Sequence, residues 1–472
     1  MVVTWLGCGT KANPQLTCSD GTCSNPDFPF CDVDGVVGGE PNTCLAVSCT
    51  PGEFAACDGD QELACNTAGD NYTANACPFG CSAASNGCNQ CSANQVACVG
   101  NDVHRCDATG METVETCAQG CIDTPAPHCA YLEPRYLPEI CDMPATSSLT
   151  IDQSGTLDTD LDTNCNGGVV TQAGGPAICV LHYSTITIGA AATLKVASSQ
   201  NQNMAGTGRA LALVADDMLD VDGMLDLSAD GYVSGPGGGN AFSGGTINAP
   251  NGGGGAGSKT DGGAGGSATA DGGAANGGAS TTDPGALTAL LGGSKATGGG
   301  GGAATLISCH GRVSVTGLID AGGGGGIGGY HLFSTTPGGG GGAGGYVVLQ
   351  GLDVSVTGEM YANGGGGGAG ANGSGTGTSV QDGHDGSLSE SVAASGGNAQ
   401  SGAGSGGAGG IAGIASQQPG NGRRSTVSGD GAGGGGGSVG WLQSYTPAGV
   451  TPTLTPSHAS PRFQPNANAS LR

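Results

Sequence analysis

The chain has 472 residues, of which 100 are glycine and only 4% are aromatic, so any hydrophobic core must use mainly Val, Ile, Leu and Ala. Lys and Arg number 12 against 38 Asp and Glu, a formal net charge of −26, which argues against nucleic acid as a partner because phosphate contacts need basic side chains. Collagen is excluded too, because glycine does not recur at every third position and proline is sparse.

The first residues read M-V-V-T-W-L-G-C-G-T. Leu6-Gly7-Cys8 is similar to the end of a bacterial lipoprotein signal, whose cysteine becomes the lipidated first residue. We therefore expect residues 1–17 to be a truncated signal or tether, with Cys8 lipidated and membrane contact only through this anchor. The alternative is that Cys8 is one more disulfide cysteine. The total of 21 cysteines is odd, and 20 remain for pairing without Cys8.

Cysteine is concentrated in the first third, where 18 of the 21 cysteines lie at or before residue 141. This density is typical of an oxidising compartment, so we expect an exported protein at the cell surface, outer membrane or outside the cell. Zinc binding is the alternative, but paired C-x-x-C groups at zinc-finger spacing are absent and the histidines are scattered.

These cysteines define three small modules. Residues 18–48 hold four cysteines and predict two bridges. Residues 49–90 and 91–130 are two copies of a six-cysteine repeat, offset by 40 to 42 residues, and each predicts three bridges of open connectivity. Modules this small need bridges because they cannot build an adequate core. The repeat cysteines are Cys49, Cys57, Cys65, Cys77, Cys81, Cys88, Cys91, Cys98, Cys106, Cys117, Cys121 and Cys129.

A proline-rich stretch, residues 131–147, is predicted to be a stiff connector. A β-rich region follows over 148–446, and a Pro/Ser/Asn tail over 447–472. Cys165 and Cys179 flank a predicted hairpin that a bridge would close. Cys141 and Cys309 either pair with each other, or Cys309 is a buried free thiol.

The β-rich region repeats one cassette, with copies around residues 210–231, 305–326 and 346–368. Alternating apolar and polar residues predict short strands, and a glycine follows at each corner. One unit cannot bury its apolar face alone, so the copies must stack. We predict an all-β fold, a right-handed parallel β-helix-like solenoid, with a β-sandwich as the alternative. The aligned pairs in the last two copies are Ile307 with Val348, Val313 with Val354, Val315 with Val356 and Gly317 with Gly358, and Leu318-Ile319 falls near Met360.

Glycine tracts follow each copy at the same position. Glycine brings no apolar surface and has the highest backbone entropy cost. The tracts are therefore predicted to be mobile loops, or to order only by backbone hydrogen bonds among themselves. Helices should be scarce, since no amphipathic run of useful length is present.

The order of parts carries a resemblance: a lipoprotein-like start, the C-S-D-G-T-C-S-N-P-D-F-P-F-C-D-V-D-G module, six-cysteine units, then V-T-G-x-x-x-A-N-G-G-G-G-G cassettes. This order resembles the Cys-rich, Gly-rich exported proteins and lipoproteins of myxobacteria. That family has no established activity to carry over. The resemblance implies export and a cell-surface or outer-membrane setting.

Motifs for nucleotide or nucleophile chemistry are weak. Residues 252–260 miss the phosphate-binding loop pattern by one position, and no helix follows. Residues 436–440 match G-x-S-x-G, but a nucleophile elbow needs a strand before the serine and a helix after it. We expect neither to function.

Two acidic runs could bind Ca²⁺ weakly, and we expect no other cofactor. Both are more simply interpreted as solvated acidic faces. A lyase would need the second run to converge with a basic residue, of which Arg209 is the nearest. The aspartates are Asp158, Asp160 and Asp162 in the first run, and Asp220 and Asp222 in the second.

The sequence therefore predicts a non-enzymatic structural or interaction protein of the bacterial surface or matrix, acting in adhesion, as a spacer or in glycan contact. Its expected partners are glycans or matrix components. A β-helix polysaccharide lyase or hydrolase is the first alternative, and a self-assembling fibre protein is the second.

Overall fold

The computed structural model divides into two compact units, Met1–Ala130 and Tyr131–Arg472, which are described separately. Almost all regular structure is strand, which confirms the expected all-β class and the scarcity of helix. The structure describes residues 17–18, 20–37, 40–117, 119–199, 208–239, 251–268, 276–279, 287–330, 336–373, 380–400, 402–412, 416–426 and 430–472.

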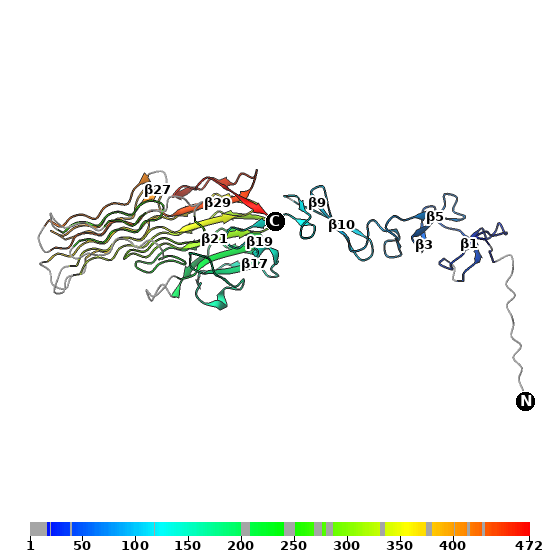
Figure 1. Ribbon diagram of the computed structural model, residues 1–472, viewed down its shortest axis with the longest axis horizontal. Helices are drawn as coiled ribbons and strands as arrows, with labels where there is room; N and C mark the ends of the chain where they lie inside the picture. Colours follow the sequence, from blue (N-terminus) through cyan, green and yellow to red (C-terminus); the bar gives the residue numbers. More distant parts are fainter. Residues whose placement is uncertain are drawn as a thin grey trace, which may run out of the picture. The chain divides into compact units, whose positions relative to one another are not determined.

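The first unit consists of short antiparallel sheets (Figure 1). Each six-cysteine repeat forms a three-stranded meander followed by a two-stranded hairpin. The strands are β1 (Phe30–Asp32), β2 (Thr43–Leu45), β3 (Phe54–Asp58), β4 (Gln61–Cys65), β5 (Tyr72–Ala76), β6 (Cys81–Ser82), β7 (Gly87–Cys88), β8 (Val96–Val99), β9 (Asp102–Cys106), β10 (Glu112–Thr116), β11 (Cys121–Ile122) and β12 (His128–Cys129).

Disulfides staple these modules. The small module has the two bridges expected, and both repeats join their first cysteine to the third, the second to the fifth and the fourth to the sixth. The shared connectivity settles what spacing left open. The pairs are Cys18–Cys31, Cys23–Cys44, Cys49–Cys65, Cys57–Cys81, Cys77–Cys88, Cys91–Cys106, Cys98–Cys121 and Cys117–Cys129.

The second unit contains a twelve-stranded sheet and a six-stranded sheet. Two short 3₁₀ helices, η1 (Ile140–Asp142) and η2 (Asp162–Asn164), precede the repeats. The strands are β13 (Leu132–Glu133), β14 (Leu149–Ile151), β15 (Gly155–Asp158), β16 (Val169–Val170), β17 (Ile178–Ile188), β18 (Thr193–Ala197), β19 (Ala210–Val221), β20 (Met224–Asp226), β21 (Ala303–Ser308), β22 (Arg312–Val315), β23 (Leu318–Asp320), β24 (Tyr346–Gln350), β25 (Asp353–Val356), β26 (Glu359–Tyr361), β27 (Ile411–Ala412), β28 (Ser416–Gln417), β29 (Trp441–Pro447), β30 (Thr453–Leu454), β31 (His458–Ser460) and β32 (Ala467–Leu471).

Consecutive cassettes stack in parallel, as the repeat predicts. Strands β19, β21, β24 and β29 lie side by side in the large sheet, and β18, β20, β23, β26 and β31 in the small one. Val313 pairs with Val354, as aligned, and of the two residues expected near Met360 it is Ile319 that pairs with it. No sheet among the described residues closes on itself, and a right-handed β-helix is not confirmed.

One aligned pair was wrong. Ile307 lies opposite Gln350 rather than Val348, which pairs with Thr305. Paired residues are 43 positions apart between β21 and β24 but 41 apart between β22 and β25. The difference arises because two more residues separate the paired positions of β21 and β22 than separate those of β24 and β25. The longer turn carries Cys309, which bonds to Cys141. Cys309 is therefore not a free thiol.

The predicted corner glycines stack on one another. A Cβ on Gly223 would overlap the carbonyl oxygen of Gly189, one on Gly317 that of Gly223, and one on Gly358 that of Gly317. Each overlap falls below 3.0 Å, a distance that real Cβ atoms essentially never show. The corners therefore need glycine for close backbone approach.

Two apolar clusters hold this unit together. One lies between the two sheets and includes Leu219, Val313, Ile319 and Met360. The other covers the opposite face of the large sheet, where side chains from residues 132–141 pack with Tyr346 and other residues of that sheet. The stretch expected as a connector thus packs on the sheet, and residues 447–472, expected as a tail, carry β30, β31 and β32.

Candidate functional site

The glycine tracts form an ordered body, here called the glycine bundle: the described parts of residues 231–239, 251–302, 322–345 and 362–440. In Figure 1 they run side by side beyond the ends of the strands. Between residues 338 and 345, N–H groups three residues apart donate to the same neighbouring segment of the chain. Gly338, Gly341 and Gly344 donate to residues 432, 435 and 438, while Gly339, Gly342 and Gly345 donate to residues 327, 324 and 321.

A period of three is that of a polyproline II-type helix, which has no internal hydrogen bonds and must donate to neighbours. The same segment accepts hydrogen bonds at 2.9–3.0 Å from Gly253, Ala256, Gly298 and Gly301. It therefore has more than the two neighbours of a β-strand. The second expectation, ordering through backbone hydrogen bonds among the tracts, describes this segment.

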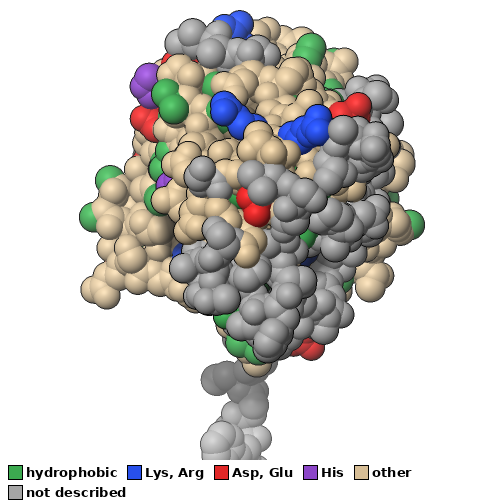
Figure 2. All heavy atoms as spheres, turned by 90° about the vertical axis from the view of Figure 1, so that its left-hand side faces the viewer, with side chains coloured by type: hydrophobic (Ala, Val, Ile, Leu, Met, Phe, Trp, Pro, Cys, Tyr) green, Lys and Arg blue, Asp and Glu red, His purple; other side chains and the backbone are tan. Residues whose placement is uncertain are grey.

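Such packing requires glycine. A Cβ on Gly437 would overlap the carbonyl oxygen of Gly342, and one on Gly365 that of Gly324, each well inside 3.0 Å. The bundle thus gains cohesion from backbone hydrogen bonds instead of apolar side chains. Among the described atoms on the face in Figure 2, the backbone and side chains that are neither hydrophobic nor charged predominate over charged side chains.

Aspartates at the side of the bundle accept N–H groups that have no backbone partner there. Asp385 accepts from Gly325 at 2.7 Å, and Asp382 from Gly328 at 2.6 Å. Asp430 accepts from Gly373 at 2.7 Å. Sequence reasoning missed these roles because an aspartate followed by glycine in a glycine-rich stretch matches no motif.

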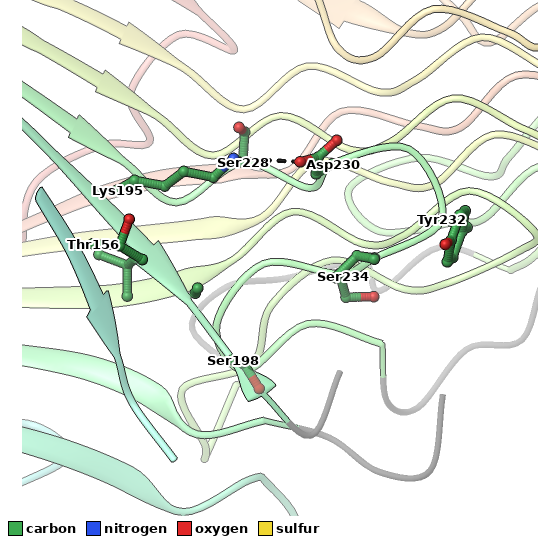
Figure 3. Close-up of a pocket in the computed structure, with 10 residues that line it drawn as sticks. Thr156, Lys195, Ser198, Ser228, Asp230, Tyr232 and Ser234 are labelled. Atoms are coloured by element: carbon green, nitrogen blue, oxygen red, sulfur yellow. Dashed lines mark hydrogen bonds and ion pairs between the residues drawn. The ribbon is translucent and has the colours of Figure 1, made fainter. Parts of the chain in front are cut away.

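A groove of about 530 Å³ opens beside the bundle (Figure 3). Its floor comes from β15 and β18, and its rim from the turn after β20. Lys195 Nζ lies 3.4 Å from Asp230 Oδ2, and their side chains are 44% and 77% exposed. Tyr232 is half-exposed. The lining residues are Thr156, Lys195, Val196, Ala197, Ser198, Ser228, Asp230, Tyr232, Val233 and Ser234.

Hydrogen bonds fix the serines of this groove. Ser198 Oγ donates to Asp160 at 2.5 Å, and Ser228 Oγ donates to Asp226 at 2.6 Å. Ser234 Oγ accepts the N–H of Gly300 at 3.0 Å, which ties the rim to a second segment of the bundle. The sequence gives no signal for the groove, because its residues come from three segments without a motif.

A second groove, of about 440 Å³, lies at the last cassette. Beside it, His458 Nδ1 lies 3.1 Å from Glu390 Oε1. Its lining residues are Glu390, Leu454, Pro456, Ser457, Ala459, Arg462 and Phe463.

The first acidic run does not converge on a common point. Asp158 accepts the backbone N–H groups of Asp160 and Ser199. Asp160 accepts from Ser198, and Asp162 Oδ1 lies 2.6 Å from Arg209 Nη1. These carboxylates serve the fold around η2.

In the second run, Asp222 is exposed and accepts a hydrogen bond from Thr316 at 2.6 Å. Asp220 is half-buried, and desolvation raises the pKa of its carboxyl, partly offset by Arg312. Arg209 pairs with Asp162 instead. The convergence that a lyase would need between Arg209 and these two aspartates is therefore not formed.

Within the described residues, two groups place three metal-ligating atoms close together: Cys18, Cys23 and Cys31, and Glu62, Cys77 and Cys88. Every cysteine in them is in a disulfide, so neither group offers thiolates. Neither group contains any of the five aspartates predicted to bind Ca²⁺.

The other predicted positions have structural roles. Ser438 of the G-x-S-x-G match is fully buried, and strand β29 follows it in place of a helix. Cys165 and Cys179 form a bridge, and β16, which lies between them in sequence, pairs antiparallel with the start of β17. Cys8 lies outside the described residues. The other 20 cysteines form ten bridges, which indicates an oxidising, exported or extracellular setting.

A buried carboxyl and a half-buried ammonium lie where the sheets meet the bundle. Burial raises the pKa of Asp320 to about 7, although the N–H of Gly322 donates to its carboxylate at 2.9 Å. Lys259 Nζ lies 5.0 Å from the ring centroid of Trp441, and burial lowers the pKa of this ammonium.

Comparison with known proteins found no matching family model, no similar curated protein and no similar solved structure. No helix in the described part of the chain is both long and apolar enough to cross a membrane.

Proposed function

We propose that this chain is a non-enzymatic structural and interaction protein of the bacterial cell surface or extracellular matrix. The glycine bundle carries the proposal. Much of the chain builds a packed body from backbone, in which Gly342, Gly365 and Gly437 occupy positions that no other residue fits. Such a body offers stiffness and surface, but almost no reactive groups.

In this proposal the parallel sheets act as one solenoid-like scaffold, and the bundle is the spacer or contact surface that it supports. The disulfide modules serve as a protease-resistant N-terminal part. Lipidation at Cys8 would anchor the protein to the outer membrane. Ten bridges support export, since disulfides persist in oxidising compartments.

The two alternatives have less support. A lyase or hydrolase would need convergent acid and base groups, and Arg209, the basic residue expected to supply one of them, pairs with Asp162. A fibre would need extended open edges, but β30 has two residues, β31 has three, and Pro456 and Pro461 flank β31. Short edges with proline limit pairing between chains.

Surface labelling of intact host cells tests the proposal. We expect a membrane-impermeant amine reagent to modify the protein without cell lysis. In parallel, the purified protein should release no new reducing ends or unsaturated products from neutral or acidic polysaccharides. Labelling only after lysis would refute the surface location, and product release would refute the non-enzymatic assignment.

A further inference from the structure

The groove beside the bundle has features that stability does not explain. The Lys195–Asp230 pair is largely exposed, and exposed ion pairs contribute little to folding. Tyr232 keeps 49% of its surface exposed at the rim. In Figure 3, Lys195 and Asp230 lie together, and Tyr232 lies beyond Asp230, on the side away from Lys195.

We propose that this groove binds a neutral hexose unit of a polysaccharide chain. This inference rests on the proposed function as an interaction protein and names the class of its partner. The volume of about 530 Å³ lies in the range of small-molecule sites. The lining includes a cationic donor, Lys195, a carboxylate acceptor, Asp230, and the aromatic ring of Tyr232, beside several hydroxyl side chains.

Each element matches part of a sugar. A vicinal diol has two hydroxyls that both donate and accept, so one can accept from Lys195 while the other donates to Asp230. The C–H face of a pyranose can pack on the ring of Tyr232, as apolar groups pack on aromatic faces. Lys195 and Asp230 balance each other's charge, which favours a neutral sugar over a uronate.

The same geometry favours binding over cleavage. Glycoside hydrolysis needs two carboxylates across the scissile bond. Among the described residues that line the groove, Asp230 is the only carboxylate. The nearby Asp160 and Asp226 accept hydrogen bonds from Ser198 and Ser228. The fixed serines make the groove a preformed surface.

The test is calorimetric titration of the full chain with cellohexaose, laminarihexaose and mannohexaose, and with hexagalacturonate as the acidic probe. We expect at least one neutral hexasaccharide to bind more tightly than the acidic probe, with little salt dependence. Tyr232→Ala should weaken this binding about tenfold, and Lys195→Met with Asp230→Asn at least as much. The matched control is Tyr330→Ala, which removes a tyrosine that is 43% exposed and does not line the groove.

Failure of every neutral sugar to bind overturns the inference, as does tighter binding of hexagalacturonate or equal weakening by Tyr330→Ala. Thermal midpoints of the three variants show whether any loss comes from unfolding. The two proposals fail separately, because surface labelling does not depend on the groove. Absent sugar binding with positive labelling would leave a surface scaffold whose partner is not a neutral glycan.

Discussion

Replacing Gly437 with alanine tests whether backbone packing holds the bundle together. Gly437 donates to Gly365 at 2.8 Å and accepts from Gly410 at 2.8 Å. Its added Cβ would overlap the carbonyl oxygen of Gly342, where ordinary contact begins at 3.4 Å. A neighbouring segment must therefore move by about 1 Å or more, because repulsion rises steeply below contact distance.

The expected cost follows from two contributions. Overpacking a tight interior costs about 1–3 kcal/mol. A shift of this size also stretches both hydrogen bonds of Gly437, and each buried group left unsatisfied costs about 1–3 kcal/mol. Cooperative packing lets part of the strain spread, so we expect Gly437→Ala to lower the free energy of unfolding by about 3 kcal/mol or more.

Urea unfolding and hydrogen exchange measure this effect. Gly155→Ala is the matched control, because a Cβ there meets nothing within 4 Å. We expect the control to stay within about 0.5 kcal/mol of the unsubstituted chain. Amides around residues 338–345 and 432–440 should exchange faster only in Gly437→Ala. Equal stability and equal exchange in the two variants would refute the packed bundle.

Three further predictions concern the rest of the chain. Cys141→Ser with Cys309→Ser should cost about 2–5 kcal/mol in urea unfolding, because this bridge spans 168 residues; an unchanged midpoint would contradict it. Burial raises the pKa of Asp320 from 3.8 to about 7, so its contribution to stability is full below 3.8 and is lost as pH rises through about 7. Asp320→Asn should flatten this pH dependence of the free energy of unfolding, which amounts to up to about 4 kcal/mol. If the variant and the unsubstituted chain lose stability in parallel as pH rises, the assignment is refuted. Intact mass of host-derived protein should show acylation at Cys8 with 20 bridged cysteines, whereas an unmodified Cys8 would remove the anchor.

The repeated parts could be predicted from sequence because they carry their own alignment. Alternation around Val313 and Val354 identifies buried strand positions, and the glycine after each pair identifies the corner. The six-cysteine repeats likewise predict two equivalent modules. Connectivity could not be predicted, since spacing alone leaves all pairings open. The error at Ile307 arose from the longer turn around Cys309, which periodicity does not detect.

The bundle and the groove lie beyond such reasoning for different reasons. Glycine has no side chain, so a tract that packs through its backbone has the same composition as one that does not. The order depends on whether donors at every third residue find acceptors on neighbouring segments, a property of the assembled body. The groove combines Thr156, Lys195 and Tyr232 from segments that only the stacked cassettes bring together.

This dependence gives the stacked sheets their role. Parallel strands place successive cassettes in one order and direction, so the glycine tracts that follow β20, β23 and β26 start next to one another. Ala229, which follows β20, donates to Gly322, which follows β23, and Gly323 donates to Asn363, which follows β26. Because the sheets fix these starting points, most of the entropy cost of bringing the tracts together is already incurred when the strands pair. The sheets thus set the order and alignment of the glycine tracts in the bundle. Loss of strand register at β23 should therefore disorder glycine segments far beyond the sheet.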